Sequence, residues 1–304
     1  LTEVVEMIMD GEASVHATTG VIDLGAVVLP DLERDNTDRN RTSPFAFTGN
    51  KFEFRMPGSA QNLSDVNMVL NTAMAKSLKE FADQMEGKTG EEFEAAAIDY
   101  IKRTLRDHER IIFNGDGYSE EWEKEAERRG LANHRTTADA LPCLVDQKSI
   151  DLFAEFGVLT EDEVRSRYEV KLEKYNKLLN IEARTMKRMV RRAYLPAINA
   201  YMSEVANTAA SKLAVSEHIS VRSETKTLEK LSSDADAMSD AIDTLQDAVN
   251  AAKALPTESE KAVAFHDNVL PVMDALRAAA DDAETICGED YWPLPSYSKM
   301  LYYV

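Results

Sequence analysis

Residues 40–55 read NRTSPFAFTGNKFEFR and hold side chains whose types and spacing could do chemistry. The last six residues predict a β-strand, because phenylalanines alternate there with polar or charged residues. On a strand, Lys51, Glu53 and Arg55 share one face and the two phenylalanines share the other. We expect the phenylalanines to anchor the strand in a core. The opposite face then carries a positive, a negative and a positive charge.

Two interpretations of this charged face stay open on the pattern alone. The first is a solvated sheet face with ion pairs between strands. In the second, Glu53 binds Mg²⁺ or Mn²⁺ together with further carboxylates or a His. Lys51 and Arg55 would then bind a polyphosphate, since guanidinium groups pair with phosphate oxygens through two hydrogen bonds. Arg41 would reach the same place after a turn at residues 48–50. The sequence contains no glycine-rich phosphate loop of the P-loop or Rossmann type.

The composition limits the classes of partner. The 304 residues include 35 Lys and Arg against 54 Asp and Glu, a formal net charge of −19. This charge repels nucleic acid and anionic lipid. Cys143 and Cys287 lie far apart without zinc-like spacing, which indicates a reducing compartment. The sequence shows no long apolar run and no signal peptide. We therefore expect a cytoplasmic protein without nucleic-acid or membrane partners.

The chain changes character near residue 60, which predicts an α+β fold. Residues 1–60 mix a short helix, apolar β-type runs such as VIDLGAVVL and polar loops. From about residue 62 onward the periodicity is almost entirely helical. Thr160 and Glu163 form a capping box before a long helix. We expect that helix to end near Leu195, because Pro196 disfavours helical geometry in the residue before it.

A helical hairpin is predicted over about residues 223–287. Its first helix carries apolar residues three and four apart, as in a heptad seam: Leu228, Leu231, Ala235, Met238, Ile242, Leu245, Val249 and Ala252. Pro256 breaks this helix, and Thr257 with Glu260 caps a second one. The second helix is expected to kink at Pro271 and to end before Gly288. A hairpin of this type serves structure or assembly rather than chemistry.

A basic stripe on the long helix has two interpretations. Its members recur three and four residues apart and are Arg184, Lys187, Arg188, Arg191 and Arg192. The stripe could bind RNA or a phosphorylated regulator. It could instead pair with the acidic helices of the C-terminal half or with another subunit, and we favour this second interpretation.

The aromatic tail YWPLPSYSKMLYYV, residues 291–304, also has two interpretations. Its amphipathic rings could face a membrane or dock onto the protein itself. We favour docking, because the chain is acidic and the tail contains two prolines. His16 could approach the charged strand, but an ordinary hydrogen-bonded histidine is the favoured interpretation.

The stretch NRTSPFAFTGNKFEFRMPGS resembles the catalytic core of glutamine synthetases, where Asn-Arg-Ser/Thr precedes a strand of the form basic-x-Glu-x-Arg. NGDGYSEEWEKEAERRGL (114–131), the long helical extension and the aromatic ending are similar to the large bacterial type III branch. The resemblance covers essentially the whole chain. It implies that residues 1–85 are the end of the catalytic domain, with a remnant of its antiparallel sheet. Residues 86–304 would be the helical type III extension.

The resemblance implies ATP-dependent ligation of ammonia to glutamate through a γ-glutamyl phosphate intermediate. By motif, Glu53 would be a ligand of an active-site Mg²⁺ or Mn²⁺. Arg41 and Lys51 would bind the phosphates of ATP and stabilise the phosphoryl group during its transfer. Arg55 would hold substrate on the glutamate side of the metals. Lys51 stands where many family members have Arg, so it keeps the charge and loses the planar fork.

Other functional parts of the family have no equivalent in these 304 residues. They are the paired glutamates that bind the other metal, a metal-binding His, the flap over the ammonia site and the N-terminal β domain. The family's site also forms between neighbouring subunits of a large ring. The resemblance therefore implies a C-terminal portion that is inactive alone, and a homo-oligomer for the full-length enzyme. The alternative is a non-catalytic helical assembly module derived from the same family.

Overall fold

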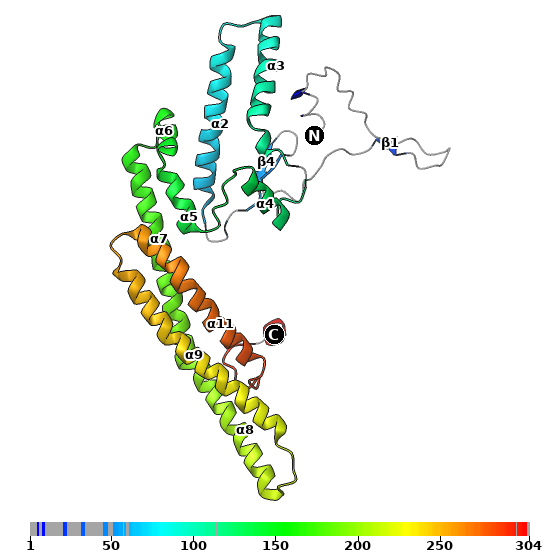
Figure 1. Ribbon diagram of the computed structural model, residues 1–304, viewed down its shortest axis with the longest axis vertical. Coiled ribbons are helices and arrows are strands. Elements are labelled where there is room, and N and C mark those ends of the chain that lie inside the picture. Colours follow the sequence, from blue (N-terminus) through cyan, green and yellow to red (C-terminus); the bar gives the residue numbers. More distant parts are fainter. Residues whose placement is uncertain are drawn as a thin grey trace. The chain divides into compact units, whose positions relative to one another are not determined.

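The structure, a computed structural model, describes Val5, Gly58 and residues 8–9, 21–22, 32–33, 45–47, 51–56, 61–113, 115–295 and 297–302 (Figure 1). The chain forms two compact units. Unit 1 comprises Leu1–His134 and Asp151–Val158, and unit 2 comprises Arg135–Ile150 and Leu159–Val304.

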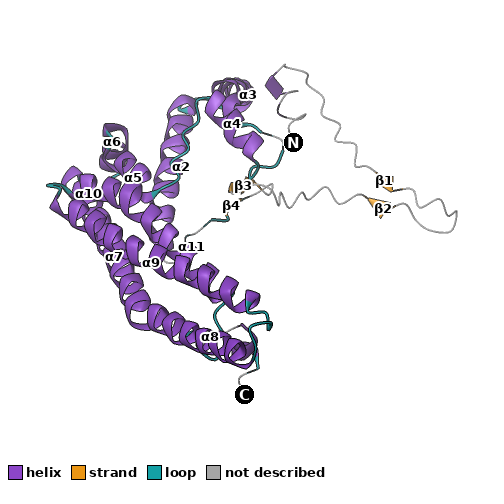
Figure 2. Cartoon of the chain, turned by 60° about the horizontal axis from the view of Figure 1, so that its bottom comes forward, coloured by secondary structure: helices purple, strands orange, loops and turns teal. Residues whose placement is uncertain are grey.

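The strands that the structure describes are short and antiparallel. β1 (Val21–Ile22) pairs with β2 (Leu32–Glu33), and β3 (Phe45–Phe47) pairs with β4 (Phe52–Phe54). All the longer elements are helices, as the colouring of Figure 2 shows. The predicted α+β class, with strands first and a large helical region after them, is confirmed.

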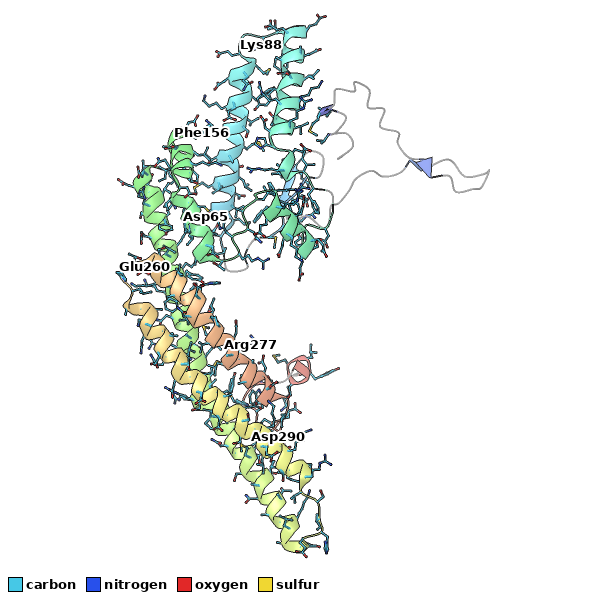
Figure 3. The ribbon with its side chains drawn as sticks, viewed as in Figure 1. Asp65, Lys88, Phe156, Glu260, Arg277 and Asp290 are labelled. Atoms are coloured by element: carbon cyan, nitrogen blue, oxygen red, sulfur yellow. The ribbon has the colours of Figure 1, made fainter. Side chains whose placement is uncertain are left out.

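The helices of unit 1 are mostly amphipathic. The described helices that lie wholly within this unit are α2 (Leu63–Met85), α3 (Gly90–Asp107), η1 (Glu109–Ile111) and α4 (Glu120–Arg128). α2 and α3 are joined by a short turn that contains Lys88, labelled in Figure 3. Gly87 begins this turn with φ of 78°, a left-handed conformation that favours glycine. The ring of Phe81 contacts the rings of Phe93 and Tyr100 across the helix pair, with centroid distances of 6.4 and 5.2 Å.

Unit 2 contains the longest helices of the described chain. Its elements are α5 (Thr137–Ala140), η2 (Leu141–Val145), the first residues of α6 (Gln147–Glu155), α7 (Glu161–Met189), η3 (Val190–Tyr194), α8 (Leu195–Val215), α9 (Arg222–Ala254), α10 (Glu258–Ala264), η4 (Phe265–Val269), α11 (Leu270–Glu284) and α12 (Tyr297–Leu301). α9 packs against both α8 and α11, which lie along different parts of it in Figure 1.

The predicted seam on α9 is the centre of the core of unit 2. Its residues Leu231, Met238 and Leu245 are fully buried, with Ile198 from α8 and Leu276 from α11 in the same cluster. A stripe with this spacing buries one side of a helix along its whole length. The predicted hairpin of α9 with α10 and α11 is therefore confirmed.

The expected end of the long helix near Leu195 is wrong. α7 continues through the π-helical turn η3 directly into α8, whose second residue is Pro196. Proline lacks the N–H that an α-helix needs, and its ring collides with the preceding turn. A π-helical turn widens the backbone there and lets the helix continue. The same device precedes Pro271, where η4 separates α10 from α11.

Both predicted capping boxes are present. Thr160 accepts a hydrogen bond from the backbone N–H of Glu163, whose carboxylate accepts one from the backbone of Thr160. Thr257 and Glu260 repeat this arrangement at the start of α10, where Figure 3 labels Glu260. These contacts satisfy N–H groups that have no partner inside the helix.

The start of the aromatic tail docks onto unit 2, as the favoured interpretation predicts. Trp292 is 9% exposed and stacks on Tyr194, with ring centroids 5.0 Å apart. The hydroxyl of Tyr291 donates a hydrogen bond to Glu204 on α8. Glycine at position 288 lets the ring of Tyr201 pack closely, because a Cβ atom at this position would lie 3.0 Å from that ring. Among the described residues, none of the helices is apolar over a stretch long enough to cross a bilayer.

Candidate functional site

The charged strand is β4, and its partner β3 fixes the register. Ala46 lies opposite Glu53, Phe45 opposite Phe54, and Phe47 opposite Phe52. Ala46 is fully buried.

Lys51, Glu53 and Arg55 meet on one face, as the alternation predicts. Arg55 donates to Glu53 Oε2 from Nη2 at 3.1 Å and from Nε at 3.3 Å. Lys51 Nζ lies 3.2 Å from Oε1 of the same carboxylate. The hydrogen bonds from Arg55, and then the one from Lys51, hold the pKa of Glu53 below its usual value. The carboxylate is therefore charged at neutral pH, with a cation beside each oxygen.

The phenylalanines of this hairpin do not enter a core in the described structure. Phe52 and Phe54 are 52% and 42% exposed, and both contact Phe45, which is 44% exposed. Phe45 stacks on Phe52 with a centroid distance of 5.2 Å. The expectation of a core anchor is thus wrong for the chain as described. A single two-stranded ladder has no second layer with which to cover the aromatic face.

The described residues do not by themselves make a complete metal site. Mg²⁺ and Mn²⁺ need several oxygen ligands, and no group of three His, Cys, Asp or Glu converges among the residues that the structure describes. Glu53 offers one such ligand. Arg41, His16 and the predicted turn at 48–50 lie outside the described residues, so the roles assigned to them stay predictions.

A second cluster surrounds Arg129, which was not among the candidate residues predicted from the sequence. Its Nη1 donates to the carbonyl oxygen of Ile112 at 2.8 Å and to that of Arg110 at 3.2 Å. Its guanidinium lies 5.9 Å from the ring centroid of Phe113 and 5.6 Å from that of Trp122. The two rings stack 4.1 Å apart. Arg129 therefore joins the segment after α3 to helix α4.

The pairing of Glu125 with this cluster predicts a pH dependence. Hydrogen bonds from Arg128, at 2.7 Å, and from Arg129 lower the pKa of Glu125 to about 2. A lowered pKa in the folded state stabilises the protein above the usual carboxyl pKa, and this stabilisation is lost as the pH falls toward about 2.

In a Trp292→Phe background, which leaves Trp122 as the fluorescent probe of unit 1, we expect unit 1 to lose more stability between neutral pH and pH ~2 with Glu125 than with Glu125→Gln. The difference between the two pH profiles isolates Glu125 from the other carboxylates. Parallel profiles would contradict the assignment.

Residues 96–213 match the family described as glutamine synthetase C-terminal domain. The chain is 37% identical to the type-3 glutamine synthetase of Dictyostelium discoideum, over 92% of this chain and 39% of the relative. The chain is therefore similar to glutamine synthetases over most of its length, with a type-3 enzyme among these relatives. A glutamine synthetase of Butyrivibrio fibrisolvens is 35% identical over 88% of the chain and 38% of the relative. One of Bacteroides fragilis is 32% identical over 99% of the chain and 42% of the relative.

The chain spans 38 to 42% of the length of these relatives. The matched family range runs from α3 into α8, so it includes the Arg129 cluster and excludes β3 and β4. Arg129 could have been found from the sequence by its position four residues after Glu125 on a helix. Its aromatic partner Phe113 could not, because that contact crosses a loop.

Proposed function

We propose that this chain supplies part of the active site of an ATP-dependent ligase that joins ammonia to glutamate through γ-glutamyl phosphate. The observation that carries the proposal is the carboxylate of Glu53 held between Lys51 and Arg55 on one strand face. The relatives of the chain bear the name glutamine synthetase. Glutamate, ammonia and ATP would be the substrates, in a cytoplasmic homo-oligomer.

Glu53 of β4 and the flanking Lys51 and Arg55 each have a role in this proposal. Lys51, with Arg41, would bind the phosphates of ATP and neutralise the charge that develops on the moving phosphoryl group. Arg55 would orient the substrate on the glutamate side. Glu53 would be one ligand of Mg²⁺ or Mn²⁺, which in phosphoryl transfer neutralises phosphate oxygens. The ion pairs with Glu53 would fix the positions of the Lys51 and Arg55 side chains before substrate binds.

The exposed apolar surface of unit 1 supports a site that is completed by further polypeptide. On α2, Leu63, Leu70, Met74 and Leu78 form one stripe and are 53%, 36%, 48% and 60% exposed. The half-exposed phenylalanines of the β3–β4 pair add to this surface. Large exposed apolar surfaces mark interaction sites. We propose that polypeptide of the kind present in the longer relatives covers them and brings the remaining ligands.

A second candidate is a non-catalytic helical assembly module. The helical bundle of unit 2 favours it, because the buried core of that bundle consists of hydrophobic residues and includes none of the side chains assigned above to substrate or metal binding. The two candidates differ in whether β4 binds nucleotide.

Mn²⁺-dependent binding of ADP tests the proposal. Calorimetry of the 304-residue chain should detect weak binding that Glu53→Gln weakens at least about tenfold, because even the loss of a group that only orients a metal ligand costs about that much. Glu155→Gln is the matched control, since Glu155 is also paired with a lysine, Lys76, in unit 1. Absence of ADP binding by the native chain would favour the assembly module.

An assay of glutamine formation from glutamate, ammonium and Mg-ATP tests the incomplete site. We expect no turnover by this chain alone. Turnover that Glu53→Gln abolishes would show that the ligands are complete within the chain, and the partial-site proposal would then be wrong.

A further inference from the structure

One edge of the basic stripe contacts α9, and the rest of it forms an open face that is exposed. The stripe consists of Arg184, Lys187, Arg188, Arg191 and Arg192. At the edge, Lys187 donates to Gln246 of α9, and Arg191 donates to Asp243 at 3.2 Å. These contacts agree with pairing to an acidic helix. On the open face, Arg184, Arg188 and Arg192 are exposed. They form no ion pair with any residue in the part of the chain that the structure describes.

An acidic stripe runs along the neighbouring helix. It consists of Asp236, Asp240, Asp243 and Asp247 of α9, which are four, three and four residues apart and all exposed. This spacing places the four carboxylates on one side of the helix. The sequence from 236 to 247 contains no Lys or Arg. Within the described residues, Asp243 is the member that has a cationic partner. The stripe is therefore uniformly negative.

The two stripes flank one seam on the same side of unit 2. Lys187 contacts Gln246 and Arg191 contacts Asp243, so residue numbers rise on α7 and η3 as they fall on α9. The helices are thus antiparallel neighbours. The bond between Arg191 and Asp243 crosses the seam from one stripe to the other.

This pattern is self-complementary under one symmetry operation. A two-fold axis parallel to the seam turns a second copy face to face and exchanges the two sides of the seam. The positive stripe of each copy then lies against the negative stripe of the other. An axis perpendicular to the helices would set like charges against each other, which is costly.

We propose that this two-striped surface of α7, η3 and α9 is an interface with a second copy of this chain, in which each basic stripe pairs with the partner's acidic stripe. Such an interface is isologous and closes as a dimer. The proposal concerns association and does not depend on the proposed ligase activity.

Charge complementarity selects a second copy over other occupants. Nucleic acid would meet the acidic stripe beside every basic contact, and its phosphates would be repelled. Two copies with net charge −19 also repel at long range, but at physiological salt this repulsion is screened beyond ~8 Å. Direct contacts between the stripes then dominate.

The two stripes are also similar in length. Arg184 to Arg192 spans ~12 Å of helix and Asp236 to Asp247 ~16 Å. Leu178 and Ile181, 44% and 57% exposed, continue the same helix and would add apolar contact.

Charge reversal on each stripe tests the interface. Sedimentation velocity of the 304-residue chain should show a dimer whose dissociation constant rises at least about tenfold between ~0.15 M and ~1 M salt, where charges are screened within ~3 Å. Arg184→Glu/Arg188→Glu lowers the charge of the basic stripe from +5 to +1, and Asp240→Lys/Asp247→Lys raises the charge of the acidic stripe from −4 to 0. Each variant alone should dimerise at least about tenfold more weakly than the native chain. Their equimolar mixture should form a heterodimer more tightly than either variant dimerises alone, because the unaltered acidic stripe of the first variant then faces the unaltered basic stripe of the second.

Lys124→Glu/Lys148→Glu is the matched control. It makes the same charge change as the arginine variant at two exposed positions that belong to neither stripe and should leave dimerisation unaltered. The proposal is overturned if the native chain is monomeric at ~0.15 M salt, which would leave the basic face to a different acidic partner. It is also overturned if the reversed variants dimerise like the native chain, if the mixture stays monomeric, or if the control behaves like the reversed variants.

Discussion

Replacing Phe265 by alanine is expected to lower the free energy of unfolding of unit 2 by about 3–5 kcal/mol. Phe265 is 1% exposed and belongs to the same buried cluster as Leu245 and Leu276. It is the first residue of the π-helical turn η4, which connects α10 to α11. Removing the ring loses its burial and leaves a cavity that the surrounding long helices can fill only in part.

The measurement is urea unfolding followed by the fluorescence of Trp292 in a Trp122→Phe background. The chain has two tryptophans, one in each unit, so this background makes the signal specific for unit 2. Val263→Ala is the matched control, since Val263 lies two residues earlier and is 47% exposed. Its expected effect is within about 0.5 kcal/mol. Equal losses in the two variants would contradict the assigned core.

Replacing Arg129 by alanine is expected to destabilise unit 1 by about 2–3 kcal/mol. Two carbonyl oxygens, those of Ile112 and Arg110, would lose a charged donor. The rings of Phe113 and Trp122 would lose the guanidinium beside them. Since these groups come from different segments, no single neighbour can replace what Arg129 provides.

Arg128→Ala separates this effect from the loss of one charge. Arg128 shares the partner Glu125, but its side chain is 72% exposed and contacts neither ring in the described structure. We expect a clearly smaller loss of stability, measured by Trp122 fluorescence in a Trp292→Phe background. Arg129→Lys keeps the charge without the planar fork and should recover less than half of the loss. Full recovery by lysine would refute the role of the fork.

The periodic elements were predictable from the sequence because their causes are local. The α9 seam, the capping boxes at Thr160 and Thr257, and the shared face of Lys51, Glu53 and Arg55 all follow from spacing along one element. The period of a helix or a strand fixes which side chains meet, whatever the rest of the chain does. The family resemblance rested on the same local motifs.

Only the tertiary structure decided the features that join distant segments. α7 continues past Pro196 as α8, where a rule based on one residue predicted an end, and α8 packs along α9 in the bundle. Arg129 meets Phe113 across a loop, and Trp292 reaches Tyr194 almost a hundred residues earlier in the sequence. Contacts of this kind depend on how the buried surfaces of whole helices fit together. That fit is a property of the packed chain and of no single stretch of its sequence.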